Sequence, residues 1–301
     1  MEKKRLGLKE ALGRDSRFNE KELRFLPRSF DVLGEIALIQ IPHELEGKEK
    51  IIGEKLIELN KHVKTVYSKG KFYGRLRKQK IEFISGKKQE ETIYKESGCL
   101  MKLNVKTCYF SPRLSTDRLE IASKCRKKEE VLVMFSGVAP YGLVIAKHAK
   151  CKKVICVELN RECTRYAKEN IKLNKLSNCE AVQGDVKKVC LEFKKKKITF
   201  DRIIMARPQL KETFLKEAFM VARKGSIIHF QDFVNQKMLK NSKNLWHHQK
   251  KSFDGFAKKI SEKRVLDAAK QAGKKIKISE FKILRELAPY KYHVRVDFKI
   301  I

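Results

Sequence analysis

From residue 130 onward, short apolar runs of the kind that form β-strands alternate with amphipathic runs of the kind that form α-helices. This alternation restricts the fold strongly, because it is produced by parallel strands that are joined by crossover helices. The pattern therefore predicts an α/β domain built on a parallel sheet. Strands are predicted at 131–135, 153–157, 180–183, 202–205 and 225–230, helices at 141–149, 161–174, 212–222 and 256–272, and two closing strands at 276–287 and 292–300.

The first part of the chain has a different pattern. Residues 36–41 and 63–67 are β-rich and flank residues 43–60, in which apolar side chains recur at helical spacing. Three further short strands are predicted at 81–84, 91–95 and 100–105, where they are separated by turn sequences that contain Ser-Gly. We therefore predict a small α+β domain over residues 1–108, followed by the α/β domain over residues 109–301.

The charge balance indicates the class of partner. The chain has 301 residues, of which 70 are Lys or Arg and 36 are Asp or Glu, so its formal net charge is +34 at pH 7. Hydrophobic residues make up 42%, which is enough to build a core and excludes a mainly disordered chain. Such an excess of positive charge favours a nucleic-acid partner. The runs Lys194–Lys197 and Lys237–Arg264 are consistent with solvated faces, but the aromatic residues within the second run also suit an unpaired RNA loop.

The eight cysteines occur singly, without the paired spacing of a zinc site, and we interpret them as free thiols in a reducing compartment. No stretch approaches the roughly 20 apolar residues that a membrane-spanning helix needs. We therefore expect a soluble, cytoplasmic protein that is monomeric and holds no metal.

A possible nucleotide site follows the first parallel strands. Gly137 lies in a turn of small residues between the first strand and its helix, and Glu158 ends the next strand. In a doubly wound sheet, such a glycine lets the backbone approach a nucleotide-like ligand, and such an acid accepts the ribose hydroxyls. Asp185, after the third strand, is placed to meet the adenine end of the same ligand. On its own the pattern is equally consistent with a tight turn and an acid that merely ends a strand.

Several segments resemble the archaeal and eukaryotic class I tRNA (guanine-N1) methyltransferases. They are Tyr-Phe-Ser-Pro-Arg-Leu-Ser-Thr-Asp-Arg at 109–118, Met-Phe-Ser-Gly at 134–137, Val-Glu-Leu-Asn at 157–160 and Glu-Asn-Ile-Lys-Leu-Asn-Lys at 169–175. Residues 29–37 and 292–297 extend the resemblance, so that it covers residues 20–301. The resemblance implies a Rossmann-like class I methyltransferase domain, S-adenosylmethionine as methyl donor, tRNA as partner, and N1 of guanine 37, next to the anticodon, as acceptor.

The resemblance also implies roles for individual residues. Asp117 stands where the family has a Glu that removes the N1 proton of guanine. Asp is one methylene shorter than this Glu. Arg113 and Arg118 match the flanking arginines, which can offset charge on guanine O6 or contact a phosphate. The alternative interpretations are a helix-start acid for Asp117 and solvated charges for the two arginines. Looser matches assign substrate binding to Arg77 and Pro208, and cofactor contacts are expected from Phe135, Gly137, Glu158, Asn160, Asp185 and Val186.

Three positions depart from the family pattern. Val133 replaces an Asp, Ala139 replaces a Gly, and Ala206-Arg207-Pro208 replaces Asn-Leu-Pro. We expect cofactor binding to survive these changes in a weakened form. Two other interpretations remain open: a wyosine-pathway enzyme that modifies a tricyclic guanine derivative, either by methylation or by aminocarboxypropyl transfer, and a tRNA-binding protein whose catalytic site has decayed.

Overall fold

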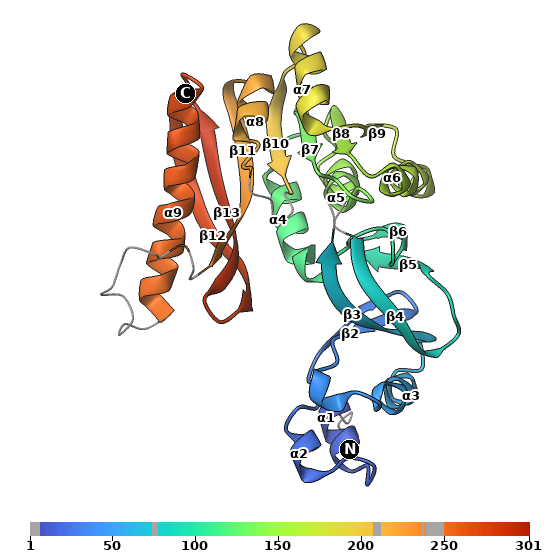
Figure 1. Ribbon diagram of the computed structural model, residues 1–301. Helices are drawn as coiled ribbons and strands as arrows, with labels where there is room; N and C mark the ends of the chain where they lie inside the picture. Colours follow the sequence, from blue (N-terminus) through green and yellow to red (C-terminus); the bar gives the residue numbers. More distant parts are fainter. Residues whose placement is uncertain (1–6, 74–77, 207–211, 236–237, 239–249) are drawn as a thin grey trace, which may run out of the picture. The chain divides into compact units, whose positions relative to one another are not determined.

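The computed structural model describes residues 7–73, 78–206, 212–235, 238 and 250–301. The chain forms two compact units, Met1–Arg113 and Leu114–Ile301, and each unit contains its own sheet (Figure 1). Within the described ranges, no helix is long and apolar enough to cross a membrane.

The first unit is built on a four-stranded sheet in the order β1-β2-β3-β4, with a separate hairpin formed by β5 and β6. Strands β2 and β3 are parallel, so the chain must cross over between them, and α3 forms this crossover. The elements are α1 (Leu8–Gly13), α2 (Glu20–Leu23), β1 (Phe30–Leu33), β2 (Ile36–Ile39), α3 (Glu49–Leu59), β3 (Thr65–Tyr73), β4 (Lys78–Gly86), β5 (Glu91–Glu96) and β6 (Cys99–Asn104), with 3₁₀ turns at His43–Leu45 and Pro112–Leu114.

Helix α3 packs closely on this sheet. Ile52 and Leu56 lie four residues apart and are completely buried in the core of the unit. Gly53 lies beside them, and a Cβ atom at this position would come within 2.6 Å of Ile84 and 2.9 Å of Ser85. The glycine therefore permits the close approach of the helix to β4.

The second unit is built on a seven-stranded sheet in the order β12-β13-β11-β10-β7-β8-β9. Strands β11, β10, β7, β8 and β9 are parallel, whereas β13 is antiparallel to both β11 and β12. The predicted α/β class is confirmed. The elements are α4 (Ser115–Lys124), β7 (Glu130–Met134), α5 (Pro140–His148), β8 (Lys153–Glu158), α6 (Arg161–Leu173), β9 (Cys179–Gln183), α7 (Val186–Lys195), β10 (Phe200–Met205), α8 (Leu215–Val221), β11 (Ala222–Asn235), α9 (Lys250–Gln271), β12 (Ile276–Ala288) and β13 (Lys291–Ile300).

Helices cover both faces of this sheet. Helices α7, α8 and α9 bury apolar side chains in a core that they share with β8 and β13, and Figure 1 shows α9 (orange) alongside β12 and β13. On the opposite face, Gly142 of α5 lies against Cys156 of β8, and side chains of α4 contact β13. Residues of a strand alternate between the two faces, so α4 and α5 share the face that α7–α9 leave open.

Two helices of the second unit differ from the sequence-based expectation. Helix α4 was not predicted, because two of the side chains that it buries are Asp117 and Arg118 and its apolar periodicity is correspondingly weak. Helix α7 was also missed, although Val186, Val189 and Cys190 give it a buried apolar stripe. Strand β11 is longer than predicted, since it takes up Ala222 from the end of the predicted helix and continues to Asn235.

Candidate active site

The strand order of the second unit defines a crevice. From β7 the chain proceeds to β8 and β9 on one side and then returns to β10 on the other side, so β7 and β10 are neighbours at the point of reversal. Ligands of doubly wound sheets bind beyond the carboxyl ends of the strands at such a point. The loops after β7, β8 and β9 are therefore the candidate cofactor site.

The loop after β7 has an unusual backbone. Phe135, Gly137 and Ala139 have positive φ angles of 61°, 56° and 69°, respectively. Alternation of left-handed residues turns successive N–H groups towards a common concave side, which is suited to a ligand with acceptor atoms. The hydroxyl of Ser136 is buried there and has no hydrogen-bond partner among the described residues. These two features indicate a loop that binds a polar ligand and not a turn that only packs against the core.

Glu158 lies at the carboxyl end of β8 and faces this loop. Its Oε2 accepts a hydrogen bond from the Gly137 N–H at 2.8 Å, and its Oε1 accepts one from the Asn160 N–H at 2.8 Å. Burial raises the pKa of Glu158, and the backbone N–H donors oppose this effect. The two bonds fix the carboxylate and leave each oxygen with further acceptor capacity for hydroxyl groups.

The other predicted cofactor residues lie at the same edge. Asn160 caps α6 by accepting from the N–H groups of Glu162 and Cys163, and Asp185 caps α7 by accepting from the Lys187 N–H at 2.9 Å. The Phe135 ring meets Phe214 edge to face, with 5.0 Å between centroids, and Val186 is buried in the core. Their part in cofactor binding stays a prediction.

Asn170 belongs to the segment 169–175 that resembles the family, and the structure gives it a positioning contact. It is completely buried in α6, and its Nδ2 donates to the Val138 carbonyl at 3.2 Å. This bond ties the glycine-containing loop to α6. An asparagine at helical spacing from apolar residues such as Tyr166 and Ala167 was the sequence signal that could have indicated this contact.

Asp117 is the centre of a buried polar group on the α4 face of the sheet. It lies in the first turn of α4 and is 5% exposed. Its Oδ1 forms an ion pair with Arg295 of β13, and its Oδ2 accepts hydrogen bonds from the Tyr141 hydroxyl at 2.5 Å and from Gln231 Nε2 at 3.0 Å. Burial raises the pKa of Tyr141 well above its usual value, so this hydroxyl stays a donor. A carboxylate offers about four acceptor positions, and three are used here.

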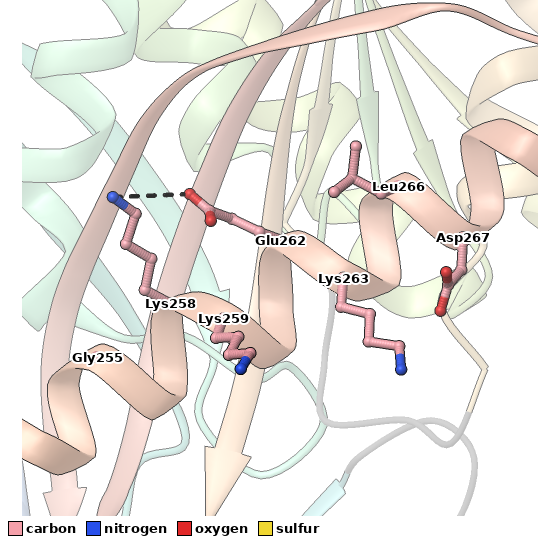
Figure 2. Close-up of a pocket in the computed structure, with 7 residues that line it drawn as sticks. All are labelled: Gly255, Lys258, Lys259, Glu262, Lys263, Leu266 and Asp267. Atoms are coloured by element: carbon pink, nitrogen blue, oxygen red, sulfur yellow. Dashed lines mark ion pairs between the residues drawn. The ribbon is translucent and has the colours of Figure 1, made fainter.

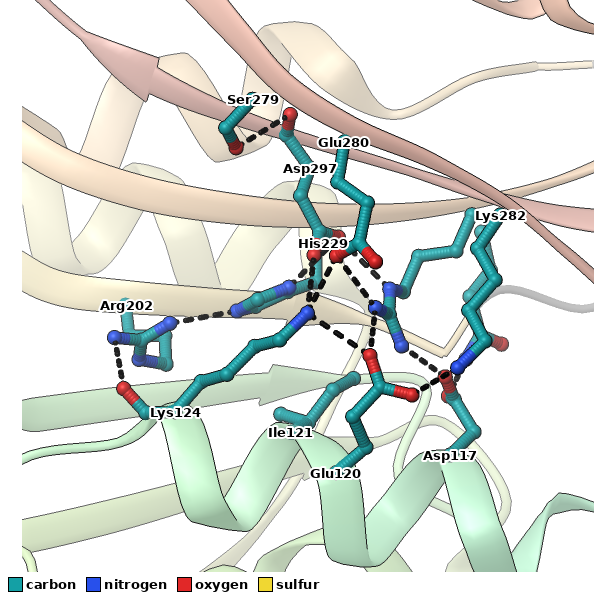
Figure 3. A network of polar contacts seen from close by, with 12 residues as sticks. Asp117, Glu120, Ile121, Lys124, Arg202, His229, Ser279, Glu280, Lys282 and Asp297 are labelled. Carbon is teal, nitrogen blue, oxygen red and sulfur yellow. Dashed lines mark hydrogen bonds and ion pairs between the residues drawn. The ribbon is translucent and has the colours of Figure 1, made fainter.

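Arg295 connects Asp117 to a larger charge network, which Figure 3 shows between α4 and the strands. Its guanidinium is completely buried and also contacts Glu120 at 2.6 Å, Asp297 at 2.9 Å and Glu280 at 3.2 Å. Burial alone would raise the pKa of Glu120, but contacts with Arg295, Lys282 and Lys124 lower that pKa to about 2. Glu120 is therefore ionised at neutral pH.

The structure brings only some of the predicted catalytic residues together. Arg118 follows Asp117 in α4, is 2% exposed, and places its guanidinium 5.7 Å from the centroid of the Tyr141 ring. Arg113 belongs to the first unit, where its Nε donates to Asp31 at 2.7 Å. Arg77 and Pro208 lie outside the described residues.

Helix α9 carries several exposed lysines, which Figure 2 draws as sticks. Lys258, Lys259 and Lys263 are exposed, and Lys258 lies 3.9 Å from the Glu262 carboxylate. A shallow hollow of about 330 Å³ is lined by Gly255, Lys258, Lys259, Glu262, Lys263, Leu266 and Asp267. Three lysines against two acids give this hollow a small net positive charge, which suits contacts with phosphates. Across the part of the chain that the structure describes, no group of three or more His, Cys, Asp or Glu side chains could hold a metal ion.

Comparisons with known proteins show the family to which this fold belongs. Residues 92–265 match the TRM5/TYW2 methyltransferase domain and residues 8–89 match the TYW2 N-terminal domain. The tRNA (guanine(37)-N(1))-methyltransferase Trm5b of Pyrococcus abyssi is 34% identical over 92% of this chain and 76% of its own length, and its crystal structure superimposes with a TM-score of 0.78 over 95% of this chain and 79% of its own.

Two further similarities concern wyosine and tRNA. The tRNA (guanine(37)-N(1))/4-demethylwyosine(37)-methyltransferase Taw22 of Nanoarchaeum equitans is 31% identical over 91% of this chain and its own entire length. The structure of aTrm5 in complex with tRNALeu superimposes with a TM-score of 0.78 at 26% identity, covering 99% of this chain and 79% of that one. The chain therefore belongs to the TRM5/TYW2 methyltransferase family, whose enzymes use S-adenosylmethionine.

Proposed function

We propose that this chain methylates N1 of guanine 37 in tRNA. The observation that carries the proposal is the buried carboxylate of Asp117, which keeps one acceptor position next to the cofactor loop of a TRM5/TYW2 methyltransferase domain. The names of the P. abyssi and N. equitans relatives both include this reaction.

The residues after β7 and β8 fit S-adenosylmethionine. The fixed carboxylate of Glu158 offers acceptors for two ribose hydroxyls, and the left-handed turn at Gly137 lets the ligand come close to the backbone. The unpaired hydroxyl of Ser136 is a further polar contact inside the same loop. When bound, the cofactor supplies an electrophilic methyl group.

The protein groups perform the acid–base work of the reaction. Guanine N1 carries a proton at neutral pH, and we assign its removal to Oδ1 of Asp117, the oxygen that Arg295 alone occupies. Arg118, buried beside Asp117, offsets the charge that develops on guanine O6. The target base must leave the stack of the anticodon loop to reach these groups, which costs a few kcal/mol in an unpaired loop.

A second candidate is methylation of a tricyclic wyosine precursor, because the N. equitans relative has both activities in its name. The loss of the family's Asn at Ala206 removes one polar contact beyond β10 and leaves more room there. This second candidate does not share the N1 deprotonation step, because the third ring of the tricyclic base is closed through N1 and leaves no proton there.

The proposal is tested by incubating unmodified tRNA with the protein and S-adenosylmethionine, followed by mass spectrometry of the nucleosides. We expect N1-methylguanosine, and we expect it to disappear for a transcript that carries adenosine at position 37. Aminocarboxypropylated product, or tight binding of tRNA without any product, would contradict the proposal. Calorimetry with S-adenosylmethionine distinguishes a tRNA-binding protein without a working catalytic site, which should not bind the cofactor, from an enzyme that was given the wrong tRNA, which should bind it.

A further inference from the structure

Strand β11 continues beyond the edge of the parallel sheet. Its pairing with β10 ends where Phe230 meets Met205, yet the strand runs on to Asn235. In this extension β11 is paired with β13 on one side, and no strand in the described part of the chain borders its other side. The extension therefore forms a wall next to the space beyond the carboxyl ends of β10 and β7.

Phe233 lies on the side of this wall that carries the candidate catalytic residues. Gln231 contacts both Asp117 and the Tyr141 hydroxyl, and side chains two residues apart on a strand share a face. Phe233 is thus the next side chain beyond Gln231 on the same face, roughly 7 Å further along the strand. It is partly exposed.

One face of the Phe233 ring is already occupied. His293, its register partner in β13, stacks on it with 4.4 Å between ring centroids and 8° between ring planes. Because His293 lies on the β13 side, the opposite face of Phe233 is turned to the β10 side, where no described strand pairs with this part of β11.

His293 is unusual among buried polar side chains. It is 3% exposed, and neither ring nitrogen has a hydrogen-bond partner among the described residues. Burial, together with the charge of Arg285, lowers the pKa of His293 to about 3, so the ring is neutral at physiological pH. Buried polar groups without partners are rare and call for an explanation such as a ligand. A flat, neutral histidine suits the second layer of an aromatic stack.

We propose that Phe233, backed by His293, is the platform on which the flipped-out nucleobase stacks during the reaction. Stacking on an aromatic face is the usual way in which proteins hold unstacked bases, and it tolerates both guanine and a larger tricyclic base. The position next to Gln231 sets the stacked base beside the Asp117 carboxylate. This inference rests on the proposed function, because it assumes that a tRNA base is the substrate.

The contact can be tested without catalysis. A tRNA transcript with 6-thioguanosine at position 37 is bound to the full-length protein in the absence of S-adenosylmethionine and irradiated with near-ultraviolet light. Trypsin cleaves after Lys224 and Lys237, so Phe233 lies in the peptide 225–237. We expect the crosslink in this peptide and its loss in Phe233→Leu. A crosslink that maps to other peptides, or that persists in Phe233→Leu, overturns the inference.

Methyl transfer gives a second readout. We expect Phe233→Leu to lower kcat/KM by about five- to 150-fold, which corresponds to about 1–3 kcal/mol of base stacking, while S-adenosylmethionine binds as before. Phe233→Tyr retains a flat ring and should retain the rate. Phe25→Leu is the matched control, because Phe25 is 42% exposed in the first unit. An unchanged methylation rate in Phe233→Leu refutes the stacking platform but leaves the proposed function standing. If the wild-type protein forms the crosslink but does not methylate the tRNA, the proposed function alone is refuted.

Discussion

Replacement of Asp117 by Asn separates a catalytic carboxylate from a structural one. Asparagine keeps the size of the side chain and an acceptor for Tyr141 and Gln231, but it removes the charge opposite Arg295. Removing one partner of a buried ion pair typically costs about 3–5 kcal/mol. The Arg295 guanidinium keeps Glu120, Asp297 and Glu280 as partners, so we expect the loss of unfolding free energy to be smaller, about 2–3 kcal/mol.

The expected effect on the reaction is larger and of a different kind. A general base contributes about 10²–10⁴-fold, so single-turnover methyl transfer by Asp117→Asn should slow by this factor at saturating S-adenosylmethionine. Its dissociation constant for S-adenosylmethionine should change little, because Asp117 does not belong to the loops at Gly137 and Glu158. The rate must be measured well below the melting temperature of the variant, which urea denaturation and a thermal scan establish.

Asp297→Asn is the matched control. Asp297 is 3% exposed, contacts Arg295 at 2.9 Å and His229 at 2.8 Å, and its pKa is lowered by these partners against the effect of burial. Asp297→Asn should lose about as much unfolding free energy as Asp117→Asn, but its methylation rate should stay within a few fold of the wild-type rate. If Asp117→Asn methylates guanine at the wild-type rate, the carboxylate is not the base. If both variants lose the rate equally, the defect belongs to the network and not to Asp117.

Three further outcomes follow from the same geometry. Glu158→Ala should weaken S-adenosylmethionine binding by about 10- to 100-fold in calorimetry, because a charged hydrogen-bond partner contributes about 1.5–3 kcal/mol. An unchanged dissociation constant would mean that Glu158 does not bind the ribose hydroxyls. The pKa of His293 is about 3 in the folded protein, below its unfolded value of 6.5, so the unfolded chain binds the proton first as the pH falls. Between pH 7 and pH 5, the wild type should therefore lose about 2 kcal/mol more unfolding free energy than His293→Phe. Equal losses in the two proteins would contradict this expectation. Replacing Lys258, Lys259 and Lys263 with Ala should make the log–log dependence of tRNA affinity on salt shallower by about two to three units, and an unchanged slope would mean that α9 does not contact phosphates.

The meeting of Gly137 and Glu158 at the candidate cofactor site could be predicted from the sequence because its signals are local. The strand that ends at Glu158 and the turn at Gly137 are each visible within about ten residues of sequence, and parallel strands bring their carboxyl ends to one edge. The helix that carries Asp117 was harder to identify, because its buried face is charged and hydrophobic periodicity reports only apolar faces.

The partners of Asp117 could not be predicted for a different reason. Arg295 lies 178 residues further along the chain and Gln231 lies 114 residues further. The polar side chains of their strands carry no local signal that shows which distant residue they contact. Only the register of β13 against β11, which pairs Arg295 with Gln231, brings both side chains to the carboxylate. Long-range contacts of this kind follow from topology and not from local pattern.

The departures from the family pattern bear on whether the site still works. Val133 is completely buried in β7 between Ile204 and Cys156, an environment in which a valine packs well and a carboxylate would need partners. An apolar side chain is thus the stabilising solution at this buried position. The group around Asp117 and Arg295 has not taken that solution, although apolar replacement of buried ion pairs is often neutral or stabilising. Stability therefore gives little reason for the buried Asp117 carboxylate to keep a free acceptor position, whereas the proposed abstraction of a proton from a bound base gives a direct reason.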